Sequence, residues 1–110
     1  GKGPNVFDCS GFVYWSINKA GISQGYMTSY MWRSCTRYQR NNNINNVKRG
    51  DVIVYYGHVA ICSGKWTMID ASQSNGRIVE RSFNSNYWHR NFIAHSAYSD
   101  NIGKAVEQKI

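Results

Sequence analysis

A cysteine at the start of a predicted helix is the residue of this sequence best suited to nucleophilic chemistry. Cys9 follows Asp8, a favourable N-cap residue, and precedes Ser10 and Gly11. In a first helical turn, unpaired backbone N–H groups and the positive end of the helix dipole favour the thiolate, which is the nucleophile. Gly11 has no side chain, so another backbone or a substrate can approach this turn. Cys9 is therefore a candidate nucleophile, although an isolated cysteine is more often a small core residue.

A histidine later in the chain can accept the proton of such a thiol. His58 opens the apolar run Gly-His-Val-Ala-Ile at positions 57–61, which is typical of a strand. A general base must lie within hydrogen-bond reach of the group that it deprotonates. If the fold brings the start of this strand to the start of the helix, Cys9 and His58 form the nucleophile and base of a cysteine hydrolase.

The helix that carries Cys9 is predicted from its apolar spacing and from its two ends. Apolar residues recur on one helical face, at Phe12, Val13, Ile17 and Ala20. Lys19 places a cation in the last turn, and Gly21 follows where a left-handed C-cap is expected. We therefore expect a helix that begins at Cys9 and ends before Gly21.

The remaining elements are predicted to change from helix to strand along the chain. The aromatic-rich residues 27–38 predict a second, shorter helix, and the asparagine-rich residues 41–46 predict a polar loop. After position 51, β-branched and aromatic runs predict five strands, at 52–56, 58–62, 66–71, 77–80 and 92–98. Turn residues join them, including a hairpin signal at Asn75 and Gly76. Consecutive hairpins imply an α+β fold with a mostly antiparallel sheet and the helices on one side.

Length and composition are those of one domain. A chain of 110 residues can bury one core but not two, and its eight Tyr and four Trp can supply both core volume and the walls of a ligand groove. The sequence has no apolar run long enough for a transmembrane segment, and no signal peptide is visible. Only eight residues precede the candidate nucleophile. We therefore expect residues 1–110 to be a single domain, excised from a longer chain or left by processing.

The chain is basic, with a formal net charge of +7 from 13 Lys and Arg against six Asp and Glu. A basic surface attracts polyanions, among them nucleic acid, anionic lipid and the teichoic acids of a bacterial wall. The charges are scattered, and no nucleic-acid-binding motif accompanies them. We interpret most of them as a solvated surface, expect no specific nucleic-acid binding, and keep anionic wall polymers as candidate partners.

The other thiols and imidazoles are given structural interpretations. No C-x-x-C motif occurs, which argues against zinc or thioredoxin-like redox chemistry. Cys62 lies in an apolar strand and is interpreted as core; a Cys35–Cys62 disulfide, which would leave Cys9 free, stays open. His95 lies within a predicted strand and His89 in a predicted loop. We expect no metal site and no cofactor.

Four segments that follow one another along the chain carry a family resemblance. They are Phe-Asp-Cys-Ser-Gly-Phe-Val at 7–13, Val-Lys-Arg-Gly-Asp-Val-Ile at 47–53, Gly-His-Val-Ala-Ile at 57–61 and Met-Ile-Asp-Ala-Ser at 68–72. They resemble the nucleophile motif, the start of the following strand, the histidine strand and the next motif of the NlpC family of bacterial cell-wall cysteine peptidases. Residues 87–94 resemble its closing strand. The resemblance covers nearly the whole chain and implies a papain-like fold, in which an N-terminal helix with the nucleophile packs on a sheet of about five strands.

The resemblance implies a function as well as a fold. Members of the family hydrolyse amide bonds of peptidoglycan stem peptides, typically between γ-D-glutamyl and a diamino acid. On that model Cys9 forms an acyl-enzyme and His58 is the general base. Asp8 and Ser10 match positions that help to hold the substrate amine, while Asp8 also remains the helix N-cap. The backbone N–H of Cys9, at a helix N-terminus, is a natural oxyanion donor.

The chain departs from the family pattern at Asp70, where a third polar residue, most often histidine, orients the catalytic histidine. A carboxylate can accept the Nδ1–H of an imidazole, fix its tautomer and stabilise the imidazolium. Strand alternation places Asp70 on the face of Met68 and opposite Ile69. We predict that Asp70 is the third catalytic residue rather than a solvent-facing one, with Gln73 as a weaker candidate.

A second departure lies upstream of the nucleophile. The family commonly has a tyrosine there that helps to bind the amino end of the substrate, and this sequence begins too late to contain it. A tyrosine between positions 26 and 38 could take its place, and the sequence does not indicate which.

Two other interpretations stay open. A related CHAP-type amidase would cut a different peptidoglycan bond, although its third residue normally comes from a different motif. A wall-binding module that has lost activity would suit the basic, aromatic-rich composition, but it would not need Cys9 opposite His58. On the leading interpretation the protein is a monomeric, extracytoplasmic enzyme, secreted or wall-associated, of host, phage or conjugation origin.

Overall fold

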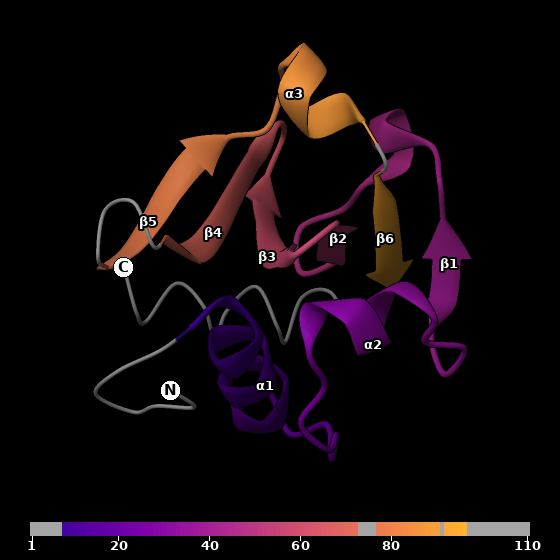
Figure 1. The fold of residues 1–110 in the computed structure, drawn as a ribbon, viewed down its shortest axis with the longest axis vertical. Coiled ribbons are helices and arrows are strands. Elements are labelled where there is room, and N and C mark those ends of the chain that lie inside the picture. The colour runs from indigo at the N-terminus through magenta and orange to yellow at the C-terminus, as the bar shows by residue number, and fades with distance from the viewer. Residues whose placement is uncertain (1–7, 73–76, 91, 97–110) are drawn as a thin grey trace.

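The computed structural model describes residues 8–72, 77–90 and 92–96, and within them six strands form one antiparallel sheet (Figure 1). The strand order is β1-β6-β2-β3-β4-β5. The strands are β1 (Gln39–Asn41), β2 (Val52–Tyr55), β3 (His58–Gly64), β4 (Thr67–Ser72), β5 (Arg77–Ser82) and β6 (Ile93–Ser96). The helices are α1 (Cys9–Lys19), α2 (Ser29–Arg33), α3 (Asn86–His89) and the 3-10 helix η1 (Ile44–Asn46). The predicted α+β class and antiparallel sheet are confirmed.

Helix α1 begins and ends where its sequence predicts. The Asp8 carboxylate accepts a hydrogen bond of 2.6 Å from the backbone N–H of Gly11, which satisfies one of the free donors of the first turn. Gly21 has a φ of +91°, the left-handed conformation that ends many helices and that glycine adopts without strain. Cys9 is the first residue of the helix, so its position relative to the sheet is set by how α1 packs.

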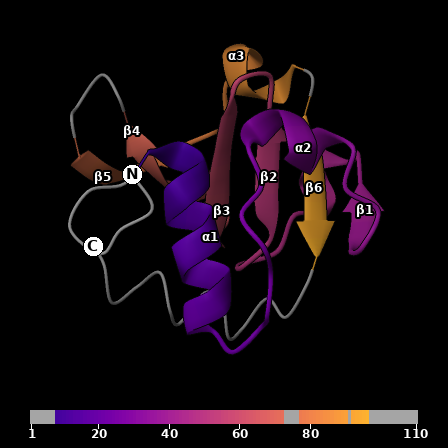
Figure 2. The ribbon, with the colours of Figure 1, turned by 60° about the horizontal axis from the view of Figure 1, so that its bottom comes forward.

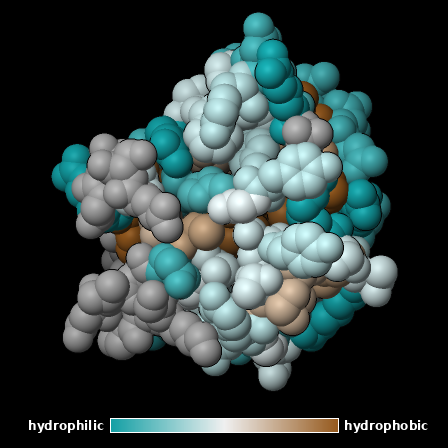
Figure 3. Space-filling model, viewed as in Figure 1, coloured by the Kyte–Doolittle hydropathy of each residue, from teal (hydrophilic) through white to brown (hydrophobic). Residues whose placement is uncertain are grey.

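Helices α1 and α2 cover one face of the sheet, as Figure 2 shows. The core between them contains Phe12, Val13 and Ile17 of α1 and Trp32 of α2, packed against alternate strand residues such as Val59. The opposite face has its own apolar cluster, with Ile53, Tyr55, Ala60, Met68 and Phe83, and Trp88 of α3 packs against it. Mostly hydrophilic and weakly polar side chains cover the face drawn in Figure 3, with apolar residues in smaller patches between them.

The structure corrects the sequence prediction between positions 27 and 46. The second helix is only Ser29–Arg33, with Thr28 as N-cap, and residues 39–41 form a strand that was not predicted, its last residue having been expected in the loop. This β1 strand pairs with β6, Arg40 lying opposite His95, so backbone hydrogen bonding to a neighbouring strand overrides the weak strand preference of Arg and Asn. Asparagine side chains hold the next turn, because Asn43 caps η1 by accepting from the N–H of Asn45.

Other differences are smaller. Residues 86–89 form the short α3, which contains His89, a residue expected on a loop, and which lies away from the face that α1 and α2 cover. Strand β5 continues to Ser82, two residues beyond its prediction. The Asn75–Gly76 turn, Gln73 and the end of the predicted last strand lie outside the described residues.

Cys62 and His95 are core residues, and the cysteines are not paired in disulfides. All three cysteines are free thiols, so the Cys35–Cys62 disulfide is not formed. Cys62 is buried and its thiol donates to the carbonyl of Gly64 at 3.2 Å. His95 is fully buried, and its Nε2 hydrogen-bonds the carbonyl of Trp32 at 2.8 Å. Among the described residues no helix has the length and apolar character needed to cross a membrane.

Candidate active site

Three elements bring the sequence-predicted site residues together: the start of α1, the start of β3 and the middle of β4. Tyr55, the last residue of β2, pairs with His58, the first residue of β3, so a two-residue turn reverses the chain between them. Gly57 has a φ of +72° in that turn, a conformation disfavoured for residues with a Cβ. The turn places His58 at the end of the sheet that faces the N-terminus of α1, where it forms a side-chain hydrogen bond with Cys9.

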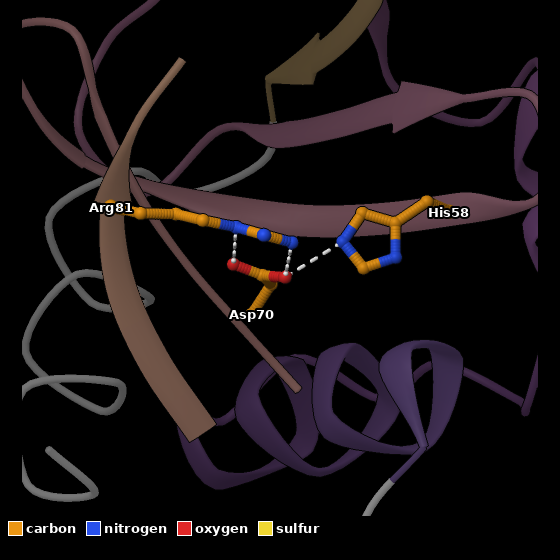
Figure 4. Close-up of polar contacts among 3 residues, drawn as sticks. All are labelled: His58, Asp70 and Arg81. Atoms are coloured by element: carbon orange, nitrogen blue, oxygen red, sulfur yellow. Dashed lines mark hydrogen bonds and ion pairs between the residues drawn. The ribbon is translucent and has the colours of Figure 1, made fainter. Parts of the chain in front are cut away.

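Asp70 lies beside His58 on the same face of the sheet. Its Oδ2 atom is 2.8 Å from Nε2 of His58, and its side chain is completely buried (Figure 4). The alternation predicted for β4 is confirmed, since Met68 belongs to one apolar cluster and Ile69 to the other. Asp70 is therefore not a solvent-facing residue.

The nitrogen that contacts Asp70 differs from the prediction. Asp70 contacts Nε2 of His58, not Nδ1, and the other ring nitrogen is turned away from Asp70 in Figure 4. His58 also interacts with Cys9, and the contact of Nε2 with Asp70 leaves Nδ1 available for a second partner. Which nitrogen carries a proton in the neutral ring is set by the acceptor next to it, and a carboxylate at Nε2 favours a proton there.

The electrostatics of this group favour an ion pair between the thiol and the imidazole. Burial alone raises the pKa of Cys9, but hydrogen bonds from His58 and from the backbone of Val59 outweigh it and hold the pKa below its ordinary value. Burial alone lowers the pKa of His58, but its hydrogen bonds to Asp70 and Cys9 outweigh that effect and raise the pKa to about 9. Thiolate and imidazolium therefore stabilise each other.

Arg81, on β5, completes the surroundings of Asp70. Its Nη2 donates to Oδ2 at 2.6 Å and its Nε donates to Oδ1 at 3.1 Å, which makes a bidentate ion pair (Figure 4). The Asp70 side chain of this pair is fully buried. The guanidinium carbon lies 4.9 Å from the ring centroid of Trp88, whose ring is also 6.0 Å from that of His58. Neither Arg81 nor Trp88 was singled out from the sequence. The signal for Arg81 was the hairpin register, which pairs it with Met68, a residue on the face of Asp70.

A cleft of about 550 Å³ opens onto Cys9 and His58. Its walls are aromatic and basic: Tyr55, Tyr56, Tyr87, Trp88, Arg81 and Arg90. The cleft is of the size expected for a small-molecule or peptide-segment site. The aromatic residues therefore line a groove as well as filling the core. Among the described residues, no group of three or more His, Cys, Asp or Glu side chains is placed to hold a metal ion.

The two predicted binding residues, Asp8 and Ser10, are the neighbours of Cys9 in the chain. Ser10 is buried, and its hydroxyl lies 2.8 Å from the hydroxyl of Tyr26. The carboxylate of Asp8 caps α1 and lies 3.4 Å from the Ser10 hydroxyl. The structure therefore brings Asp8, Ser10 and Tyr26 together next to the thiol, and it puts one tyrosine of the 26–38 segment at this place.

Comparison with known proteins identifies the family. The model of the NlpC/P60 family matches residues 1–97, which include Cys9, His58 and Asp70. The chain belongs to the NlpC/P60 family. The crystal structure of the NlpC/p60 domain of the peptidoglycan hydrolase SagA has the same fold, with a TM-score of 0.66 and 28% identity, over 88% of this chain and 82% of that chain. The predicted papain-like architecture of this NlpC/P60 domain is confirmed.

Relatives of this NlpC/P60 chain include much longer proteins. The probable endopeptidase p60 of Listeria innocua is 38% identical over 81 residues, covering 69% of this chain and 16% of the relative. The peptidoglycan DL-endopeptidase CwlO of Bacillus licheniformis is 31% identical over 91 residues, covering 78% of this chain and 20% of the relative. The chain thus spans about a fifth or less of the length of these two relatives.

Proposed function

We propose that this protein is an extracytoplasmic cysteine peptidase that hydrolyses amide bonds in peptidoglycan stem peptides. The observation that carries the proposal is the chain of contacts from Cys9 to His58 to Asp70 at the base of an aromatic cleft. The names of CwlO and SagA support a peptidoglycan substrate, and the name of p60 supports an endopeptidase. The 110 residues would then form one catalytic domain.

The proposed reaction follows from the protonation states of the pair. The Cys9 thiolate attacks the carbonyl carbon, and the backbone N–H of Cys9 stabilises the oxyanion. The C–N bond then breaks while the His58 imidazolium gives its proton to the leaving amine, which leaves a thioester. His58, now neutral, takes a proton from water as the water attacks the thioester, and C–S cleavage restores the thiolate and the imidazolium. Asp70 holds the ring in place and stabilises its charged form.

The proposed substrate bond is that between γ-D-glutamyl and a diamino acid. On this proposal the free amine on the acyl side is held by Asp8 and Ser10, because a carboxylate and a hydroxyl are suitable partners for an ammonium group. Tyr26, whose hydroxyl contacts Ser10, would complete this site in place of the upstream tyrosine of the family. No metal or cofactor takes part in the proposed reaction.

The test is digestion of purified peptidoglycan, followed by mass spectrometry of the released fragments. We expect the wild type to release cut stem peptides whose masses identify the bond, and Cys9→Ala to release none. Cys35→Ala is the matched control, since Cys35 is another partly exposed free thiol, and it should behave as the wild type. Cleavage between the glycan and the peptide would instead indicate an amidase. If neither wild type nor Cys9→Ala cuts walls, yet both co-sediment with them, the protein is a binding module.

A further inference from the structure

We propose that Arg81 is a positioning residue that acts on the catalytic histidine through Asp70. This inference rests on the proposed function of Cys9 and His58. It assigns to Arg81 two tasks: holding the Asp70 carboxylate in one orientation, and offsetting the negative charge of that carboxylate beside His58.

The orientation task follows from how the carboxylate oxygens are shared. Oδ1 of Asp70 accepts from Nε of Arg81, and Oδ2 accepts both from Nη2 of Arg81 and from the His58 ring. A planar guanidinium that meets a carboxylate through two parallel hydrogen bonds fixes both its position and its plane. His58 alone contacts one oxygen and would leave the carboxylate free to rotate. Because Asp70 is fully buried, water is not at hand to replace the missing donors.

The charge task follows from burial. His58 is charged in part of the proposed cycle and neutral in the rest, so without Arg81 the buried Asp70 carboxylate would lack a charged partner whenever His58 is neutral. Arginine stays protonated throughout. The charge of Arg81 also opposes that of Asp70, which limits how strongly Asp70 retains the proton on His58.

Other groups near His58 do not take over this task. Cys9 of α1 is its reaction partner, and Tyr55 of β2 has a buried hydroxyl with no hydrogen-bond partner among the described residues. Burial and the charge of Asp70 raise the pKa of Tyr55, so it stays neutral. Arg90 lines the same cleft, but among the described residues the arginine that forms an ion pair with Asp70 is Arg81. Trp88 of α3 packs on the guanidinium of Arg81 and so helps to keep it in place.

The test compares Arg81→Met and Arg81→Lys with the control Arg77→Gln, which removes a positive charge from an exposed position of the same strand. Two quantities are measured: kcat for stem-peptide cleavage, and the pH midpoint for alkylation of Cys9 by iodoacetamide in a Cys35→Ser background. The second reports the thiolate whether or not the substrate assignment is right. Circular dichroism melting checks the fold of each variant.

We expect Arg81→Met to lower kcat by about 10-fold to 100-fold, as loss of a group that orients an active-site ligand does in other sites. Loss of a nearby cation makes the site more negative, so the alkylation midpoint should rise by on the order of one pH unit. Arg81→Lys keeps the positive charge but lacks the guanidinium that makes two parallel hydrogen bonds. Its alkylation midpoint should therefore stay near that of the wild type while kcat falls. Arg77→Gln should change neither quantity.

Wild-type kcat together with a wild-type midpoint in a folded Arg81→Met protein would overturn the inference. If Arg81→Met does not fold, Arg81→Lys decides: reduced kcat at an unchanged melting temperature supports the inference, and wild-type kcat refutes it. If the wild type cuts no peptidoglycan but the midpoint still rises in Arg81→Met, the proposed substrate is wrong and the link from Arg81 to the Cys9–His58 pair is supported.

Discussion

Asp70 gives His58 a buried partner that carries a full negative charge, and this sets the working range of the thiol–imidazole pair. A neutral partner could orient the ring but would stabilise the imidazolium less. Burial alone lowers the pKa of His58, but the hydrogen bonds to Asp70 and Cys9 raise it to about 9, while the interaction with His58 helps to hold the pKa of Cys9 below its ordinary value. The reactive ion pair forms as pH rises through the pKa of Cys9 and is lost as pH rises through that of His58. Activity should therefore extend into alkaline conditions.

Replacement of Asp70 by asparagine tests that role. Asparagine is close in shape but uncharged, so we expect Asp70→Asn to lower kcat much more than it raises KM, by about 10²-fold or more. Removing the negative charge disfavours the imidazolium, so the alkaline limb of the kcat profile should move to lower pH. The alkylation midpoint of Arg81→Met is expected to move the other way, to higher pH. Kinetics between pH 5 and pH 10 measure both effects. Wild-type turnover in Asp70→Asn would remove Asp70 from the mechanism.

Residue types and their local context were enough to select Cys9 and His58 from the sequence, whereas Asp70 was selected through the family resemblance and strand alternation; the structure brings the three together. Arg81 and Trp88 could not be selected in this way. Their role depends on which residues lie diagonally across the β4–β5 hairpin and on how α3 folds over it, and neither follows from composition. Tyr26 was one of several tyrosines until the approach of its hydroxyl to Ser10 distinguished it.

At the scale of elements, the start of α1 combines a structural and a proposed binding task in one side chain. Asp8 accepts from the N–H of Gly11 as N-cap, and it is also proposed to face the substrate amine. The first task needs only an acceptor oxygen, whereas the second gains from a negative charge. Two substitutions can therefore separate them.

We expect Asp8→Asn to keep the melting temperature and to raise KM by roughly 10-fold, because its amide oxygen still caps the helix but no longer pairs with an ammonium group. Asp8→Ala should raise KM as well and, in addition, destabilise the fold by about 1 kcal/mol. Thermal melting and steady-state kinetics on a stem peptide give both numbers. An unchanged KM in a stable Asp8→Asn protein would confine Asp8 to capping.

Elements with strong local signals were predicted well, and elements held by tertiary contacts were not. Helix α1 has a cap, an apolar face and a terminal glycine, and β2 to β5 are β-branched or alternate clearly. Strand β1 exists because β6 offers a hydrogen-bonding edge, which no propensity of Gln39–Asn41 reveals. Helix α3 is a single turn, too short to show a periodic pattern.

At the scale of the whole molecule, two of the few carboxylates of this basic chain are withdrawn from the surface. Asp51 and Asp70, two of the six acidic residues, are completely buried and hydrogen-bonded to internal partners. Asp51, for example, accepts from the backbone N–H of Lys48 and from Ser96. The net charge of the chain is +7, on a small body with a radius of gyration of 12.2 Å. Such a field raises the rate of encounter with polyanions.

The positive charge predicts that salt slows the encounter of the protein with the wall and not the chemical step. Raising ionic strength from about 0.05 M to about 0.5 M shortens the screening length severalfold, so digestion of walls that carry anionic polymers should slow by about 10-fold or more. Digestion of walls stripped of those polymers should slow much less, and cleavage of a small soluble stem peptide should change least. Turbidity loss and peptide release give the three rates. Because the Cys9–His58 pair is partly buried, its chemistry is shielded from salt, and equal slowing of all three substrates would rule out attraction to the polymers as the cause.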